Sequence, residues 1–204
     1  MYPIKLIVPL IVAFLHQGSC LPAPVVERQI STIQVIQTHV NTANSAVRGD
    51  MVSLMSAIAA SSAEQSQLIS TIKSDLTNVA GHFETAGSSI ASSTASTGTI
   101  LTAPELLALS STMTTVQSLA GSMLEDYVVA KSELSDDTKT ATQTEWAAAL
   151  SAIKPFSDPL AAYASKVKQE GSTFGGSGLV AVQVASAGML GAVEALLASV
   201  GVGK

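Results

Sequence analysis

Cysteine is nearly absent from this sequence of 204 residues, and its single copy, Cys20, lies at the end of an N-terminal leader. The leader has one early cation, Lys5, then an apolar run from Leu6 to Leu15, then a polar stretch that ends in small residues. This layout is typical of a secretory signal peptide, and the apolar run is too short to span a bilayer. We therefore predict secretion, with cleavage after Cys20.

Removal of this leader excludes disulfide bonds, because the secreted chain then has no cysteine. Small secreted domains commonly depend on disulfides, so here the packed core alone must supply the stability. The rest of the chain is long enough for one such core. We predict a signal peptide over residues 1–20, a short pro-segment over residues 21–28 and a single domain over residues 29–204.

Charged side chains are also scarce, at 12% of residues, and there are fewer basic than acidic ones. Once Lys5 leaves with the leader, nine basic and fifteen acidic side chains remain, which gives a net charge of −6. No cluster of basic residues occurs anywhere in the chain. Because nucleic acids are bound through such clusters, we expect no nucleic-acid partner.

Residue patterns that support catalysis or metal binding are absent as well. His39 and His82 are far apart and belong to no metal-ligand spacing. Ser177 is followed two positions later by Leu179, where a nucleophile elbow requires glycine. Asp136 and Asp137 are adjacent acidic residues, but the positions around them do not form a loop of oxygen ligands for calcium. The sequence therefore predicts a protein without enzymatic activity, metal or cofactor.

What the sequence does contain is apolar residues at alternating spacings of three and four positions, in five segments. Such spacing places them along one face of an amphipathic helix in a bundle. The first helix is expected to stop at Gly49, and the second to begin near Asp50 and run to Phe83. The apolar seams of these two helices are Ile33, Ile36, Val40, Ala43 and Val47, and Met51, Leu54, Ile58, Ile69, Ile72, Leu76, Val79 and Phe83.

The third segment runs from Leu106 to Ala130, and Thr102 and Glu105 before it have the spacing of a capping box. Residues 87–101, which precede it, are almost entirely Ser, Thr, Ala and Gly. We expect a connecting loop here, with a continuation of the second helix as the alternative. Its hydroxyl groups are potential O-glycan acceptors, whereas no Asn-x-Ser/Thr sequon occurs in the chain.

The last two segments each carry one unusual feature. The fourth, from Trp146 to Val167, contains Pro155 and Pro159, so the helix should kink or break there. The fifth, from Leu179 to Val200, has one charge, Glu194, and is apolar on most faces. We expect a buried helix, with a removable glycolipid-anchor tail as the alternative. Together the segments predict an all-α fold, a five-helix bundle with mostly antiparallel helices.

Several stretches of this chain resemble the fungal hydrophobic surface binding protein A family, which includes cell wall galactomannoproteins. The stretches are Val47-Arg48-Gly49-Asp50, Leu68-Ile69-Ser70-Thr71-Ile72-Lys73, the Ser/Thr-rich gap, and Leu101-Thr102-Ala103-Pro104-Glu105-Leu106-Leu107-Ala108-Leu109. The resemblance implies an extracellular or wall-associated bundle of five helices. It further implies attachment to hydrophobic surfaces, as in some members, or a fatty acid enclosed between the helices, as in others.

The seams mix branched aliphatic residues with small residues and methionine. This composition either leaves space for an apolar ligand or is used up by close helix contact. A fatty acid is feasible because each buried methylene contributes about 0.8 kcal/mol. Its carboxylate would need polar partners, for which we consider Ser62, Gln65 and Ser186. The candidate cavity residues are Leu54, Ile58, Ile72, Leu76, Leu109, Met113, Val116, Leu150, Ile153, Leu160, Ala185, Met189 and Val193.

These patterns indicate a secreted, non-enzymatic protein of the cell wall or the medium. Its expected partners are a fatty acid or another single-chain lipid, a hydrophobic surface, and cell wall glycans. A soluble lipid carrier and a protein that adsorbs to hydrophobic surfaces are the first two hypotheses. The alternative is a structural cell wall mannoprotein without a lipid ligand.

Overall fold

The computed structural model describes residues 23–60, 64–95, 98, 100–170 and 176–201, and the side chains of 23–31 and 168–170 are not among the described features. The predicted signal peptide, residues 1–20, lies outside these ranges. Of the predicted pro-segment, residues 23–28 are helical and continuous with the first helix. Secretion and cleavage therefore stay predictions.

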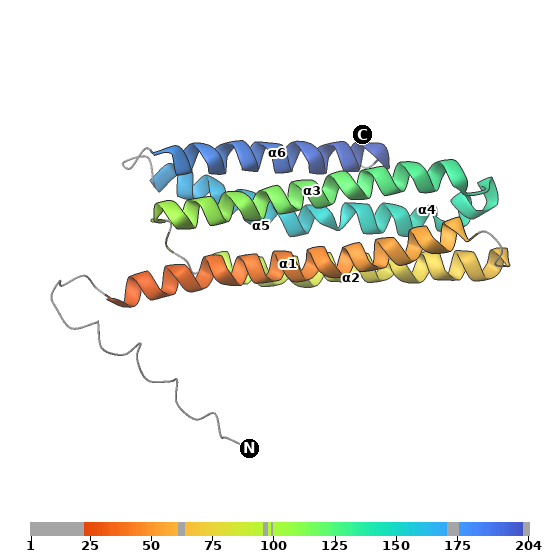
Figure 1. Ribbon diagram of the computed structural model, residues 1–204, viewed down its shortest axis with the longest axis horizontal. Helices are drawn as coiled ribbons and strands as arrows, with labels where there is room; N and C mark the ends of the chain where they lie inside the picture. The colour runs from red at the N-terminus through yellow and green to blue at the C-terminus, as the bar shows by residue number, and fades with distance from the viewer. Residues whose placement is uncertain (1–22, 61–63, 96–97, 99, 171–175, 202–204) are drawn as a thin grey trace, which may run out of the picture.

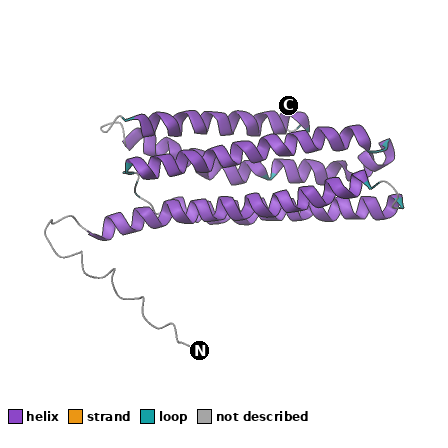
Figure 2. Ribbon diagram, in the orientation of Figure 1, coloured by secondary structure: helices purple, strands orange, loops and turns teal. Residues whose placement is uncertain are grey.

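All regular structure in the described residues is helical, which confirms the all-α bundle (Figure 2). Because α4 and α5 are separated by Ala152 alone, they correspond to the single fourth helix of the five predicted. The helices are α1 (Ala23–Ala59), α2 (Gln65–Ala95), α3 (Ala103–Glu133), α4 (Asp136–Ser151), α5 (Ile153–Glu170) and α6 (Ser177–Ser199).

The helices form three layers (Figure 1). Helices α1 and α2 form one outer layer, α3 with α4 and α5 forms the middle layer, and α6 alone forms the other outer layer. Helix α5 continues in the direction of α4, whereas the other consecutive helices run antiparallel, so α1, α3 and α6 run in the same direction. Hydrogen bonds between these parallel helices join residues 70 or 71 positions apart in the sequence. Arg48 on α1 donates to Ser118 on α3, and Ser110 on α3 donates to the carbonyl oxygen of Ala181 on α6.

Helix α1 continues through Gly49, so the predicted boundary at Gly49 and Asp50 is wrong. The reason is visible in the seam, because Val47, Met51 and Leu54 keep the spacing of four and three and are all buried. Gly49 lies away from the core, and a Cβ atom built on it would meet nothing within 4 Å. Its cost is therefore only the helix propensity of glycine, about 1 kcal/mol relative to alanine, which burial of the seam outweighs.

Helix α2 extends to Ala95, so most of the predicted loop over residues 87–101 is helical. Ile90 is completely buried and anchors this extension to the core. The hydroxyl groups of Ser89 and Ser92 donate to the carbonyl oxygens four residues earlier, at 3.0 and 2.9 Å, and so keep their polar groups paired within the helix. The alternative, a continuation of the second helix, is the one that the structure shows.

Helix α3 begins with the predicted capping box. The backbone N–H of Thr102 donates to the Glu105 carboxylate at 2.8 Å, and the Thr102 hydroxyl lies 2.6 Å from the same oxygen. This pairing gives a hydrogen-bond partner to polar groups that have none within the helix at its N-terminus. Glu105 is only 8% exposed, so the cap lies against the core and fixes where α3 enters the bundle.

The proline-induced break lies at Ala152, three residues before Pro155. Pro155 has no N–H group to donate to the carbonyl oxygen of Ser151, and the proline ring would collide with that carbonyl in a continuous helix. Helix α4 therefore ends at Ser151. Pro155 itself lies in the first turn of α5, where an N–H group would lack a helical partner anyway. Pro159 stays inside α5. The expected break is therefore confirmed, but it falls before the proline pair rather than between its members.

Candidate functional site

The thirteen candidate cavity residues all lie in the core. Each is at most 7% exposed, and together they come from all six helices. This confirms their inward orientation. Two pockets are prominent on the described part of the molecule, and none of the thirteen lines either of them. A lipid cavity among these residues therefore stays a prediction.

The three candidate head-group residues are not brought together. Ser62 lies outside the described residues. Gln65 is exposed at the start of α2, where its side-chain nitrogen lies 3.4 Å from the hydroxyl oxygen of Thr138 on α4. Ser186 is half-buried on α6, in the opposite outer layer from α2 (Figure 1). The described members of the set cannot hold one carboxylate in common.

Helix α6 departs most from expectation, because it is not buried on all sides. Only 28% of its most apolar stretch is buried. One face, which includes Val182, Met189 and Leu196, packs on the bundle. The opposite side, here called the α6 outer face, carries large apolar side chains in solvent. Its apolar members are Val180, Val184, Ala187, Leu190, Gly191, Ala195 and Ala198, and the exposed side chains of Gln183 and Glu194 lie among them.

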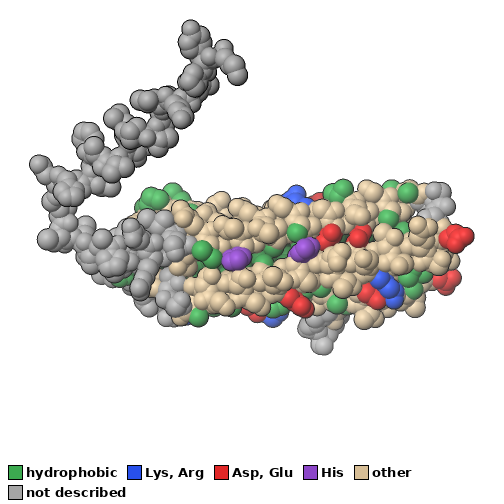
Figure 3. Space-filling model, turned by 90° about the horizontal axis from the view of Figure 1, so that it is seen from below, with side chains coloured by type: hydrophobic (Ala, Val, Ile, Leu, Met, Phe, Trp, Pro, Cys, Tyr) green, Lys and Arg blue, Asp and Glu red, His purple; other side chains and the backbone are tan. Residues whose placement is uncertain are grey.

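By length and composition, α6 is also the one described helix that would suffice to cross a membrane, which is weak evidence by itself. Figure 3 shows the face that α1 and α2 form, on the side of the molecule away from α6. Seen from that side, most of the surface is uncharged and polar, with apolar side chains in small separate groups. Apolar character therefore runs along α6 rather than along this face.

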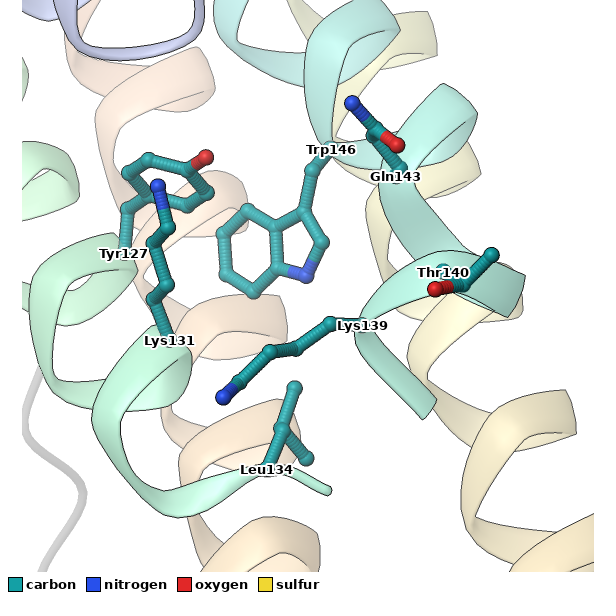
Figure 4. Close-up of a pocket in the computed structure, with 7 residues that line it drawn as sticks. All are labelled: Tyr127, Lys131, Leu134, Lys139, Thr140, Gln143 and Trp146. Atoms are coloured by element: carbon teal, nitrogen blue, oxygen red, sulfur yellow. The ribbon is translucent and has the colours of Figure 1, made fainter. Parts of the chain in front are cut away.

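A pocket of about 210 Å³ lies where α3 turns into α4 (Figure 4). The rings of Tyr127 and Trp146 meet in it with centroids 5.1 Å apart and planes tilted by 56°. The ammonium of Lys131 lies 5.7 Å from the centroid of the Tyr127 ring, and Lys139 pairs with Asp136 at 3.1 Å. Its lining residues are Tyr127, Lys131, Leu134, Lys139, Thr140, Gln143 and Trp146.

A second, more open hollow of about 450 Å³ lies between α1 and α3 and is polar. Arg48 crosses it, donating to Asn44 at 3.0 Å and to Ser118 at 3.4 Å. The hydroxyl groups of Thr114 and Thr115 donate back to carbonyls of α3. Because these groups already bond within the protein, the hollow offers a ligand few free donors.

The perturbed ionisable groups do not converge on either pocket. Burial raises the pKa of Asp75, a hydrogen bond from Ser53 lowers it, and repulsion from Asp50 raises it further. Burial, with the charge of Glu105, raises the pKa of the Tyr163 phenol to about 12, and this phenol donates to the carbonyl of Gly98 at 3.3 Å. Among the described residues, no three His, Cys, Asp or Glu side chains are grouped to hold a metal ion.

No family model, curated protein sequence or solved structure matches this chain. The resemblance to the hydrophobic surface binding protein A family therefore stays a prediction. Assignment of a function rests on the geometry of the α6 outer face and of the pocket at the α3–α4 turn. Sequence reasoning missed both features, although it named Trp146 and several residues of α6.

Proposed function

We propose that this protein binds hydrophobic surfaces through the α6 outer face, and that it does so outside the cell or at the cell wall. The observation that supports the proposal is the exposure of large apolar side chains on a helix with one charged residue, Glu194. Val180 is 59% exposed and Val184 is 67% exposed. A largely apolar face of this kind, which Gln183 and Glu194 interrupt, is typical of surfaces that meet another apolar phase.

The strength of such binding follows from the side chains that contact would bury. Complete burial of a valine or leucine side chain contributes about 1.5–3 kcal/mol. Val180, Val184 and Leu190 are already partly covered, so together they contribute on the order of 3–5 kcal/mol before the costs of association. Each molecule would thus bind weakly and reversibly, and stable coating would require many molecules side by side.

A fatty acid enclosed in the bundle is the second candidate, and its place would be where α6 meets its neighbours through small residues. Ala185 is buried there, and a Cβ atom on Gly188 would lie 2.7 Å from the side-chain oxygen of Gln117. Since contact this close leaves little room, an acyl chain would enter only after α6 separates from α3. A structural mannoprotein is the third candidate, and it requires neither adsorption nor lipid.

Adsorption to alkyl-coated beads tests the proposal with a matched pair of variants. Val184→Lys places a charge on the α6 outer face, whereas Val52→Lys places one on α1 at the same exposure, 66% against 67%. Both side chains lie in solvent, so thermal unfolding should be unchanged in both. We expect Val184→Lys to adsorb several-fold less than the wild type and Val52→Lys to adsorb normally.

Two results would count against the proposal. Equal adsorption of both variants would show that another surface is responsible. Absence of wild-type adsorption would favour the structural mannoprotein. Lipid extraction of the purified protein completes the comparison, because a co-purified single-chain lipid would favour the enclosed fatty acid.

A further inference from the structure

The pocket at the α3–α4 turn combines groups that the α6 outer face does not use. Two of the chain's ten basic side chains, Lys131 and Lys139, lie at this one pocket in a protein with net negative charge. The indole nitrogen of Trp146 is turned toward Lys139 (Figure 4) and makes no hydrogen bond within the described residues. An ammonium group and an indole N–H can only donate hydrogen bonds. The pocket therefore presents donors and positive charge.

The remainder of the pocket is formed by the apolar surfaces of Trp146, Leu134 and Tyr127 and by the polar side chains of Thr140 and Gln143. Trp146 is 4% exposed and Leu134 is 6% exposed, so both present fixed surfaces, and the Tyr127 ring packs against the indole at a tilt of 56°. The volume of about 210 Å³ exceeds the roughly 150 Å³ that holds benzene and is below the roughly 300 Å³ typical of drug-sized ligands. A ligand of matching size has one ring, or a short alkyl chain, beside its charged group.

The lysines are able to accept a new partner. The partner of Lys139, Asp136, is 98% exposed, so this ion pair contributes little and can exchange for a ligand carboxylate. Lys131 has its ammonium near the Tyr127 ring, an arrangement that leaves its N–H groups free to point at an anion. The two ammonium groups lie on different sides of the pocket, Lys131 beside the Tyr127 ring and Lys139 beside Leu134 (Figure 4). A carboxylate at either group would form charge-assisted hydrogen bonds, which are stronger than neutral ones.

We propose that this pocket binds organic carboxylates whose apolar body is about one ring or a short alkyl chain in size. Lys131 and Lys139 supply the positive charge that attracts the carboxylate, and the indole N–H of Trp146 is a further donor. Trp146, Tyr127 and Leu134 enclose the apolar body. The same chemistry is offered by a free aromatic acid and by the head end of a fatty acid, and the site is independent of the α6 outer face.

Intrinsic fluorescence reports on this site directly, because Trp146 is the only tryptophan in the chain. Phenylacetate represents the aromatic acids, octanoate the fatty acids, and benzyl alcohol a ring without charge. We expect a saturable change with at least one of the two acids, with a dissociation constant on the order of 1 mM. Benzyl alcohol should bind about tenfold more weakly, since it lacks the charge that both lysines recognise.

The double variant Lys131→Gln/Lys139→Gln should weaken binding of the acid about tenfold. The matched control Lys154→Gln/Lys166→Gln changes the net charge equally on α5, away from the pocket, and should bind like the wild type. Saturation-transfer NMR of the ligand gives a second readout that does not depend on the indole. Preference for phenylacetate or for octanoate identifies the source of the ligand.

Three results would overturn the proposal. The first is no saturable binding of either acid by fluorescence or NMR. The second is equal affinity for benzyl alcohol and the acids, and the third is unchanged affinity in the Lys131→Gln/Lys139→Gln variant. Because none of these measurements involves adsorption, failure here leaves the function proposed for the α6 outer face untouched, and the converse also holds.

Discussion

Gly87 and Gly81 lie six residues apart on α2 but should respond in opposite directions to alanine. A Cβ atom built on Gly87 would lie 2.7 Å from the carbonyl oxygen of Pro155 and 3.1 Å from the Cα atom of Phe156. Both are backbone atoms of α5, which cannot rotate away as a side chain could. The approach occurs where Pro159 has no N–H group to offer the Pro155 carbonyl. On Gly81 the same Cβ would meet nothing within 4 Å.

Two opposing effects set the magnitudes. Alanine is favoured over glycine inside a helix by about 1 kcal/mol. At Gly81 this effect acts alone, so Gly81→Ala should raise the free energy of unfolding by about 0.5–1 kcal/mol. At Gly87 the helices must separate, and overpacking of this kind costs about 1–3 kcal/mol. Because the contact is with backbone, we place the cost at the upper end and expect a net loss of about 1–2 kcal/mol for Gly87→Ala.

Thermal unfolding followed by circular dichroism distinguishes the two variants. For a domain of this size, 1 kcal/mol corresponds to a shift in Tm of about 2–4 °C. Gly81→Ala should therefore raise Tm by about 1–4 °C, and Gly87→Ala should lower it by about 2–8 °C. A Gly87→Ala variant as stable as Gly81→Ala would refute the close approach of α2 and α5.

Three further predictions concern the core, an acidic pair and the leader. Ala185→Phe should destabilise the bundle by about 1–3 kcal/mol in urea unfolding, because neither described pocket adjoins Ala185; full stability with reduced fatty-acid uptake would instead show a cavity. Asp75→Asn should stabilise the protein at pH 7 but not at pH 3. The pKa of Asp75 is raised above its usual 3.8, so ionisation of Asp75 lowers the free energy of unfolding. This loss is absent below the usual pKa and fully present above the raised one. An equal effect of the substitution at both pH values would contradict this. N-terminal sequencing of the secreted protein should begin at Leu21, and an intact Met1 on a cytosolic protein would contradict secretion.

Burial along the helices was predictable because it depends on local spacing. Ile72, Leu76 and Val79 follow the three-four pattern and are completely buried. Helix ends were less predictable, because a glycine disfavours helix only weakly and does not end a helix whose apolar seam continues past it. At Gly49 the spacing from Val47 to Met51 is uninterrupted, and attention to that spacing would have removed the boundary.

The exposed side of α6 could not be predicted from its own sequence. A helix that is apolar all round shows no contrast between its faces, so the side that stays in solvent depends on how many neighbours cover it. Here α3 and α5 cover one side only. The pocket at the α3–α4 turn was missed for a different reason, because Tyr127 and Trp146 meet only after the chain reverses at Leu134 and Ser135.

A polarity-sensitive fluorophore on the α6 outer face tests the central claim most directly. The chain from Leu21 onward has no cysteine, so Val184→Cys and Val52→Cys each provide a unique labelling site at equal exposure. On alkyl-coated beads, the label at position 184 should shift its emission to the blue and become protected from an aqueous quencher, while the label at position 52 stays in water. A label at position 184 that remains open to the quencher on adsorbed protein would contradict binding through α6.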